Sequence, residues 1–152
     1  LAIPASCQSL GPAYDRELDR LMAAVSEEYL RYFSAFRPPK TLSVQLASAV
    51  KDHYAAVRSG ATLAGFYCLR GLDEGYDRPS FGIYVVSSHA GEGLARLALN
   101  DAFAWCLRHG LSRVMLKVYP ENMAAYKIYA EQGFVDIGQS PDSQRIMEKV
   151  LA

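Results

Sequence analysis

The sequence predicts a single mixed α/β domain, on the strength of three observations. The chain has 152 residues, an ordinary length for one domain, and 51% of them are hydrophobic, which is enough for one core. Stretches with apolar residues at helical spacing alternate with short β-branched and aromatic stretches. Glycines and prolines fall between these stretches, and we find no internal repeat or linker. Residues 1–152 are therefore expected to form one domain of interleaved strands and helices.

The first half of the chain carries two helical patterns and a hairpin pattern. Its predicted elements are a short strand at residues 2–10, a helix from Asp15 to about Phe36, a helix at 42–52, and strands at 54–59 and 62–70. Leu18, Leu21 and Val25 give the first helix its spacing, and Pro38–Pro39 ends it. A turn at Ser59–Gly60–Ala61 joins the two strands into a β-hairpin.

The second half reads as alternating strands and helices. Its predicted elements are a loop at 71–80, a strand at 81–87, a helix at 93–109, a strand at 112–119, a helix from Asn122 to Gln132, and strands at 134–139 and 144–150. Asn122 is a suitable cap for the second helix, and Gly110 and Gly133 follow the two helices where left-handed backbone usually ends them.

Composition excludes several classes of function. The 16 basic and 16 acidic residues give a formal net charge of zero, which disfavours nucleic-acid binding. No stretch reaches the ~20 apolar residues of a membrane span, and LAIPASC at the start lacks the features of a signal peptide. Cys7, Cys68 and Cys106 are odd in number and form no CxxC pair, so we expect no metal site and no disulfide. We expect buried cysteines at 68 and 106 and a cytoplasmic protein.

HAGEGLARLAL, residues 89–99, leaves a predicted strand and opens a predicted helix. Gly91 and Gly93 allow unusual backbone angles, and the free N–H groups of a helix start attract anions. The stretch could therefore be a simple turn or an anion-binding loop. It fits neither GxGxxG nor GxxxxGK[ST], and Ala90 supplies no cation.

Two motifs together resemble the GCN5-related N-acetyltransferases (GNAT). Residues 90–95, AGEGLA, resemble that family's [QR]xxGx[GA] loop and depart from it only at Ala90. Residues 122–134, NMAAYKIYAEQGF, are similar to N-x-x-A-x-x-[LI]-Y-x-x-x-G-F, with matches at Asn122, Ala125, Ile128, Tyr129, Gly133 and Phe134. The resemblance covers residues 54–151.

The resemblance implies a mostly antiparallel central sheet flanked by helices, in which parallel strands at 81–87 and 112–118 splay to form a cleft for acetyl-CoA. Residues 84–86 would offer backbone groups to the pantetheine arm, and the N–H groups near residues 91–96 would hold the pyrophosphate. The cofactor-binding residues expected from the family are Tyr84, Val85, Val86, Ala90, Gly91, Glu92, Gly93, Leu94, Ala95, Arg96, Asn122, Ala125 and Tyr129. Without a cation at position 90, His89 or Arg96 would supply the charge, and Arg96→Ala should raise the acetyl-CoA KM.

The implied reaction is direct attack of a neutral amine on the thioester carbonyl. Tyr129 would protonate the departing thiolate, whereas its alternative role is to pack against Phe134. The candidate bases are Glu74, Asp73, Asp77 and Tyr84, and a water relay could replace them. The expected catalytic residues are Tyr129, Glu74 and Tyr84.

The expected acceptor is a small, cationic amine, because the loop at 71–80 is acidic. Polyamines, amino sugars, amino acids and protein amines all stay open. Four aromatic residues of the first helix could pack on the core or line an acceptor pocket: Tyr29, Tyr32, Phe33 and Phe36. Dimers are common in the resembled family, so a homodimer is a further expectation.

Two alternatives stay open. The chain could use a longer acyl-CoA, which the pocket near Tyr84 would decide. It could also be a non-catalytic acyl-CoA-binding or interaction domain, a reading that Ala90 favours and that Asn122 and Tyr129 oppose.

Overall fold

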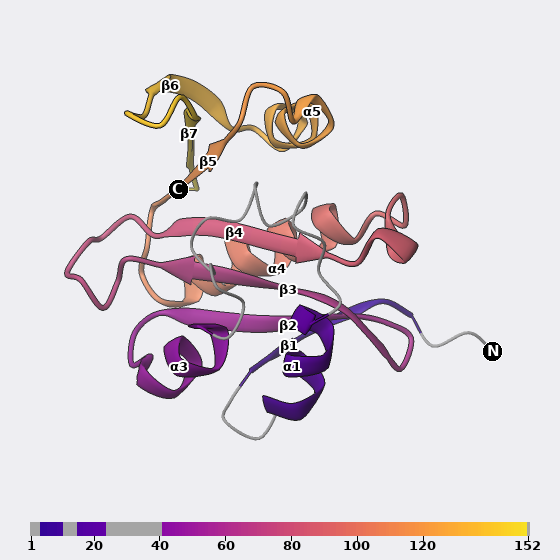
Figure 1. The fold of residues 1–152 in the computed structure, drawn as a ribbon. Coiled ribbons are helices and arrows are strands. Elements are labelled where there is room, and N and C mark those ends of the chain that lie inside the picture. Colours follow the sequence, from indigo (N-terminus) through magenta and orange to yellow (C-terminus); the bar gives the residue numbers. More distant parts are fainter. Residues whose placement is uncertain (1–3, 11–14, 24–40, 152) are drawn as a thin grey trace.

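A seven-stranded sheet organises the protein (Figure 1). The computed structural model describes residues 4–10, 15–23 and 41–151. Its elements are β1 (Ser6–Ser9), α1 (Asp15–Ala23), α3 (Thr41–Ser48), β2 (His53–Ser59), β3 (Thr62–Arg70), β4 (Ser80–Val85), η3 (Ser87–His89), α4 (Leu94–Arg108), β5 (Arg113–Val118), α5 (Met123–Glu131), β6 (Val135–Gln139) and β7 (Arg145–Val150). No helix in these ranges is long and apolar enough to cross a membrane.

The strand order is β1-β2-β3-β4-β5-β7-β6, and every neighbouring pair is antiparallel except β4 and β5, which are parallel. The mostly antiparallel sheet with one parallel pair is confirmed. The predicted strands and helices also occur in the predicted order, with ends shifted by a few residues. The first predicted helix is described as α1 only as far as Ala23; its remainder, including Tyr29, Tyr32, Phe33 and Phe36, and the Pro38–Pro39 stop lie outside the described residues.

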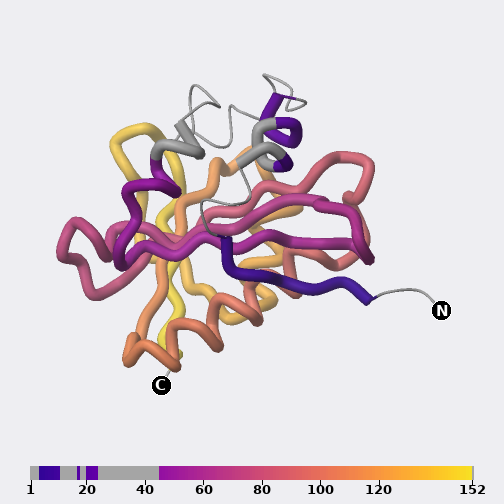
Figure 2. The backbone as a smooth tube through the Cα atoms, turned by 90° about the horizontal axis from the view of Figure 1, so that it is seen from below, coloured from indigo at the N-terminus to yellow at the C-terminus, as the bar shows by residue number. Residues whose placement is uncertain are grey.

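Helices cover both faces of the sheet, with α4 on one face and α1 and α3 on the other (Figure 2). The sheet has a hydrophobic core on each face, and β4 contributes side chains to both because successive residues of a strand point to opposite faces. Phe81, Ile83 and Val85 pack into the core beneath α4, whereas Tyr84 and Val86 pack into the core beneath α1 and α3. Cys68 and Cys106 are free and buried, as the sequence predicted.

A buried polar group lies beneath α4. The Tyr67 hydroxyl donates to Asp101 Oδ2 at 2.5 Å and lies 3.1 Å from His53 Nε2. The His53 ring stacks on Trp105, which stacks in turn on the exposed His109. Burial is the main cause that lowers the pKa of His53 to about 4, against an opposing attraction from Asp101.

Strands β3 and β4 approach closely at Gly65. A Cβ atom at this position would lie 2.0 Å from the carbonyl oxygen of Tyr84, so only glycine fits without a backbone shift. Next to Gly65 and Tyr84, the Val86 N–H donates to the Ala64 carbonyl at 2.7 Å. The carboxyl end of β4 is therefore held firmly to β3 where the glycine loop begins.

Candidate active site

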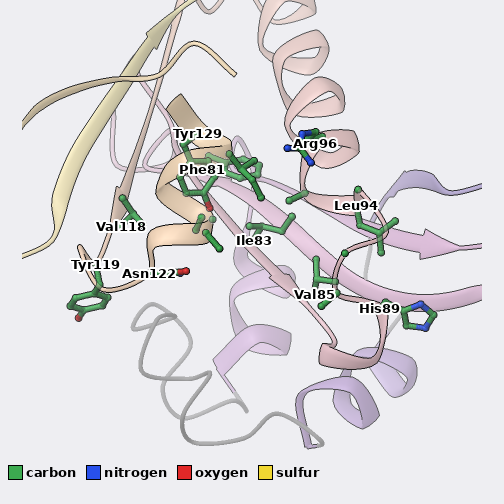
Figure 3. A pocket seen from close by; sticks show the side chains of 18 of the residues that line it. Phe81, Ile83, Val85, His89, Leu94, Arg96, Val118, Tyr119, Asn122 and Tyr129 are labelled. Atoms are coloured by element: carbon green, nitrogen blue, oxygen red, sulfur yellow. The ribbon is translucent and has the colours of Figure 1, made fainter. Parts of the chain in front are cut away.

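A cleft opens between β4 and β5 because the two strands diverge. In the described chain they pair at one register position, Ser80 opposite Met115, next to a 3.0 Å hydrogen bond from the Met115 N–H to the Pro79 carbonyl. Arg78 pairs with Glu148 of β7 at this closed end. A cavity of about 350 Å³ lies along the open part (Figure 3). Its walls come from β4, the glycine loop with the first turn of α4, β5 and α5.

The backbone of β4 directs polar groups into this cleft. Along a strand, successive residues point their N–H and C=O groups to opposite neighbours. The Pro79 carbonyl points to β5 and the Val86 N–H points to β3, so the odd-numbered residues between them face β5. Ile83 and Val85 therefore direct their backbone groups toward the space from which β5 has moved away. Both residues also line the cavity.

The glycine loop and the start of α4 form one end of the cavity. Gly91 and Gly93 have φ angles of 82° and 77°, a left-handed backbone that favours glycine. Gly93 precedes α4 without a side-chain cap, and its carbonyl accepts the Leu97 N–H at 3.2 Å. The N–H groups of the first helical turn have no acceptor within the helix. Since Leu94, Ala95 and Arg96 line the cavity, this end is suited to an anion.

The charges around this end are already paired. Glu92 Oε1 accepts from the Ser59 hydroxyl at 2.7 Å, and Glu92 Oε2 lies 2.7 Å from His89 Nδ1. The hydrogen bond from Ser59, followed by the one from His89, lowers the pKa of Glu92. Arg96 Nη2 donates to Glu131 Oε2 of α5 at 2.8 Å. His89 and Arg96, the two side chains that the sequence suggested in place of a cation at position 90, therefore both contact a carboxylate.

Asn122 occupies the residue before α5, where the sequence predicted a helix cap. The position is confirmed, but its side chain makes no capping hydrogen bond. The side chain lines the cavity and points toward β4 (Figure 3). Its amide can both donate and accept, which suits the amide groups of an extended ligand.

Tyr129 lies at the inner part of the cavity (Figure 3). The ring is 9% exposed and makes edge contacts with Phe81 and Phe134, at centroid distances of 6.5 and 5.9 Å. No residue in the described chain hydrogen-bonds its hydroxyl. Burial raises the pKa of Tyr129 to about 12, so the phenol is protonated at neutral pH and can donate a proton or a hydrogen bond. Packing and chemistry are therefore compatible roles for this side chain.

The cavity lining includes most of the predicted cofactor residues: Val85, Ala90, Gly91, Gly93, Leu94, Ala95, Arg96, Asn122, Ala125 and Tyr129. Tyr84, Val86 and Glu92 are not among the lining residues. Tyr84 of β4 and Val86 just after it pack into the core on the opposite face of the sheet, where the Tyr84 ring lies 6.2 Å from Phe66. Glu92 is held by Ser59 and His89 instead.

The acidic loop at residues 71–80 precedes β4, whereas the glycine loop follows it, so the two lie at opposite ends of the strand (Figure 1). Asp73 accepts the backbone N–H groups of residues 50–52, which lower its pKa. Asp77 lies 3.7 Å from Arg113. Glu74 is exposed and is not among the residues that line the cavity. None of these three acids is among the residues that line the cavity.

Sequence reasoning missed several residues of the lining: Phe81, Gly82, Ile83, Lys117, Val118, Tyr119, Ala124 and Ile128. Phe81 and Ile83 share the face of Val85, so strand alternation would have found them once Val85 was assigned. Lys117 and Tyr119 carried no signal, because nothing in the sequence indicates where β5 separates from β4.

The sequence model of the Acetyltransferase (GNAT) family matches residues 22–134. The chain belongs to this family. The match includes β4, the glycine loop, β5 and α5, which together enclose the cavity. No curated protein matches the chain significantly in sequence.

Solved N-acetyltransferase structures share the fold of this chain over nearly its whole length. A chimera of the spermidine N-acetyltransferase SpeG from Vibrio cholerae and hSSAT superposes with a TM-score of 0.75 at 20% identity, covering 97% of this chain and 95% of the other. PaiA N-acetyltransferase from Thermoplasma acidophilum, solved in complex with coenzyme A, gives 0.75 at 18% identity, covering 97% and 99%. At these identities the likeness establishes the fold alone.

Proposed function

We propose that this GNAT protein is an N-acetyltransferase that moves an acetyl group from acetyl-CoA to a primary amine of a small molecule. One observation carries the proposal. A single cavity joins unpaired helix N–H groups at the glycine loop to a protonated, buried phenol at Tyr129. An anion site at one end and a proton donor at the other match the two ends of a reacting acyl-CoA.

The cavity offers contacts for the pyrophosphate and the pantetheine arm of acetyl-CoA. The N–H groups of Leu94, Ala95 and Arg96 would hold the pyrophosphate, with backbone donors taking the place of a side-chain cation at Ala90. The backbone groups of Ile83 and Val85 would pair with the pantetheine amides like a short added strand. Binding of acetyl-CoA in this cavity is supported by PaiA N-acetyltransferase, a protein of this fold that was solved with coenzyme A.

The reaction proceeds in a ternary complex. The amine nitrogen attacks the thioester carbonyl carbon, the C–S bond breaks, and the electron pair leaves on sulfur. The Tyr129 hydroxyl gives its proton to the departing thiolate and regains one from solvent, while the attacking nitrogen gives its proton to a base. The pKa of about 12 keeps Tyr129 in the donor form at neutral pH.

The base is proposed to be Tyr84, Glu74 or a relayed water. Tyr84 lies on β4 between Ile83 and Val85, but its ring packs into the core on the opposite face and is not among the cavity-lining residues. Glu74 is exposed in the loop that leads into β4 and is not a cavity-lining residue, so it would act on the amine through water. Because neither side chain lines the cavity, a relayed water would carry the proton from the amine to either one.

The acceptor is proposed to be a cationic small-molecule amine. Two solved neighbours are described as spermidine N-acetyltransferases, which supports this class. The acids at 73 and 77 contact protein groups, so the attraction for such an amine would come from the wider field of the loop and from Glu74.

We also propose a homodimer. In the described sheet β6 forms an edge, where Val135 and Ile137 are 64% and 52% exposed. A structural neighbour, the spermidine N-acetyltransferase of V. cholerae, is described as dodecameric. Light scattering should give a mass of at least two chains, and the mass of one chain would contradict the proposal.

Two experiments test the enzymatic proposal. Calorimetric titration should show acetyl-CoA binding, and absence of binding at millimolar concentration would exclude every acyl-CoA function. A panel of polyamines, amino sugars and amino acids should then release free thiol with at least one acceptor. Binding without turnover on any amine would favour a non-catalytic acyl-CoA-binding domain.

A further inference from the structure

Phe81 closes the inner end of the cleft. It follows Ser80, the residue at which β4 still pairs with β5, so it lies where the strands begin to separate. Its ring lines the cavity but is only 4% exposed. Figure 3 shows it beside Tyr129, at the end of the cavity away from His89 and the glycine loop.

The Phe81 ring is supported from behind. Tyr67 stacks against it at a centroid distance of 5.7 Å and an interplanar angle of 30°. Tyr67 is itself fully buried and is fixed by its hydrogen bond to Asp101. Because protein cores are close-packed, Phe81 cannot turn away without displacing this polar group. The end wall of the cavity is therefore rigid.

An acyl-CoA bound as proposed above has its phosphates at the glycine loop and its thioester near Tyr129. Its acyl group then extends toward Phe81. We propose that Phe81 sets the acyl-chain length, so that the cleft accepts acetyl and rejects longer chains. The inference rests on the proposed function and decides between its acetyl-CoA and longer acyl-CoA forms. The sequence predicted that the pocket near Tyr84 would decide acyl-chain length. The proposal assigns this role to Phe81, which lies on the other face of β4.

The expected discrimination follows from known pocket energetics. One methylene more than an apolar pocket can hold changes selectivity by about 10- to 200-fold. Wild-type protein should therefore lose affinity and kcat/KM stepwise from acetyl- to propionyl-, butyryl- and hexanoyl-CoA. Phe81→Leu should move the preferred length upward, and Phe81→Ala should move it further.

The test titrates the four acyl-CoAs and free CoA against each variant by calorimetry, which needs no acceptor, and compares kcat/KM once an amine is found. Phe103→Leu is the matched control, because Phe103 packs on Phe134 and is not a cavity-lining residue. It should keep the wild-type order of chain lengths. If Phe81→Ala fails to fold, Phe81→Leu still tests the inference, because it keeps an apolar side chain in the core.

The outcomes separate the two proposals. Wild-type protein that binds neither CoA nor any acyl-CoA would overturn the proposed function and this inference together. Protein that binds CoA but accepts hexanoyl as well as acetyl would overturn the inference alone. The inference would also fail if folded Phe81→Leu kept the wild-type order. A shift in chain-length preference with free-CoA affinity unchanged would support it.

Discussion

Arg96 and Glu131 form an ion pair that joins the first turn of α4 to the last residue of α5, with 2.8 Å between Nη2 and Oε2. Arg96 also lines the cavity at its anion-binding end. Both side chains are about half exposed, so the pair is weak. Phosphate groups at the glycine loop would therefore compete with Glu131 for the same guanidinium.

Glu131→Gln should tighten CoA binding by releasing Arg96. An exposed ion pair contributes about 0.2–1 kcal/mol, so we expect the Kd to fall by up to about fivefold. Arg96→Ala should raise both the Kd and the acetyl-CoA KM. Calorimetry at two salt concentrations measures these changes, with Arg108→Gln at the other end of α4 as control. Unchanged affinity in Arg96→Ala would mean that the loop relies on its backbone alone.

Ser59 should improve CoA binding indirectly, by holding the Glu92 carboxylate. Freed from Ser59, this carboxylate would lie in a loop built for an anion and repel the phosphates. We expect Ser59→Ala to raise the Kd by about two- to tenfold, the range of a hydrogen bond to a charged group reduced by exposure. The double variant Ser59→Ala with Glu92→Gln should recover the loss, because the repelling charge is gone. If the double variant binds as weakly as Ser59→Ala, charge is not the cause.

His53 should make the protein less stable in mild acid. Its folded pKa of about 4 lies below the unfolded value near 6.5, so the unfolded chain binds more protons between these values. The free energy of unfolding should therefore fall as pH drops from about 6.5 to about 4, by on the order of 3 kcal/mol from this group. Denaturant unfolding of His53→Gln should show a smaller fall than wild type over this pH range. Equal slopes in wild type and His53→Gln would contradict the assignment.

Much of the fold could be predicted because its signals are local. The spacing of apolar residues defined the helices, and the turn at Ser59–Gly60–Ala61 defined the first hairpin. Gly91 and Gly93 marked the strand-to-helix loop, where the structure shows left-handed backbone. The parallel pairing of β4 with β5 did not follow from local pattern and came from the family resemblance.

The site was predicted less completely, because its remaining features depend on contacts between distant segments. Asn122 was expected both to cap α5 and to bind the cofactor, but its side chain makes no capping hydrogen bond, and the residue lines the cavity. Glu131 lies 35 residues after Arg96, and no spacing rule links them. The acids of the 71–80 loop looked available for an amine, but Asp73 is bound to backbone groups from another loop. Such pairings exist only once the sheet is assembled.

Tyr129→Phe tests the central claim most directly. The phenyl ring keeps its contacts with Phe81 and Phe134, so the fold and the CoA Kd should change little. Losing the proton donor should lower kcat by about 10²- to 10⁴-fold, the usual contribution of general acid catalysis. Parallel measurement of thiol release and of CoA binding in this variant should thus show a large loss of kcat with nearly unchanged affinity. Undiminished kcat would remove Tyr129 from the chemistry and contradict the proposed mechanism.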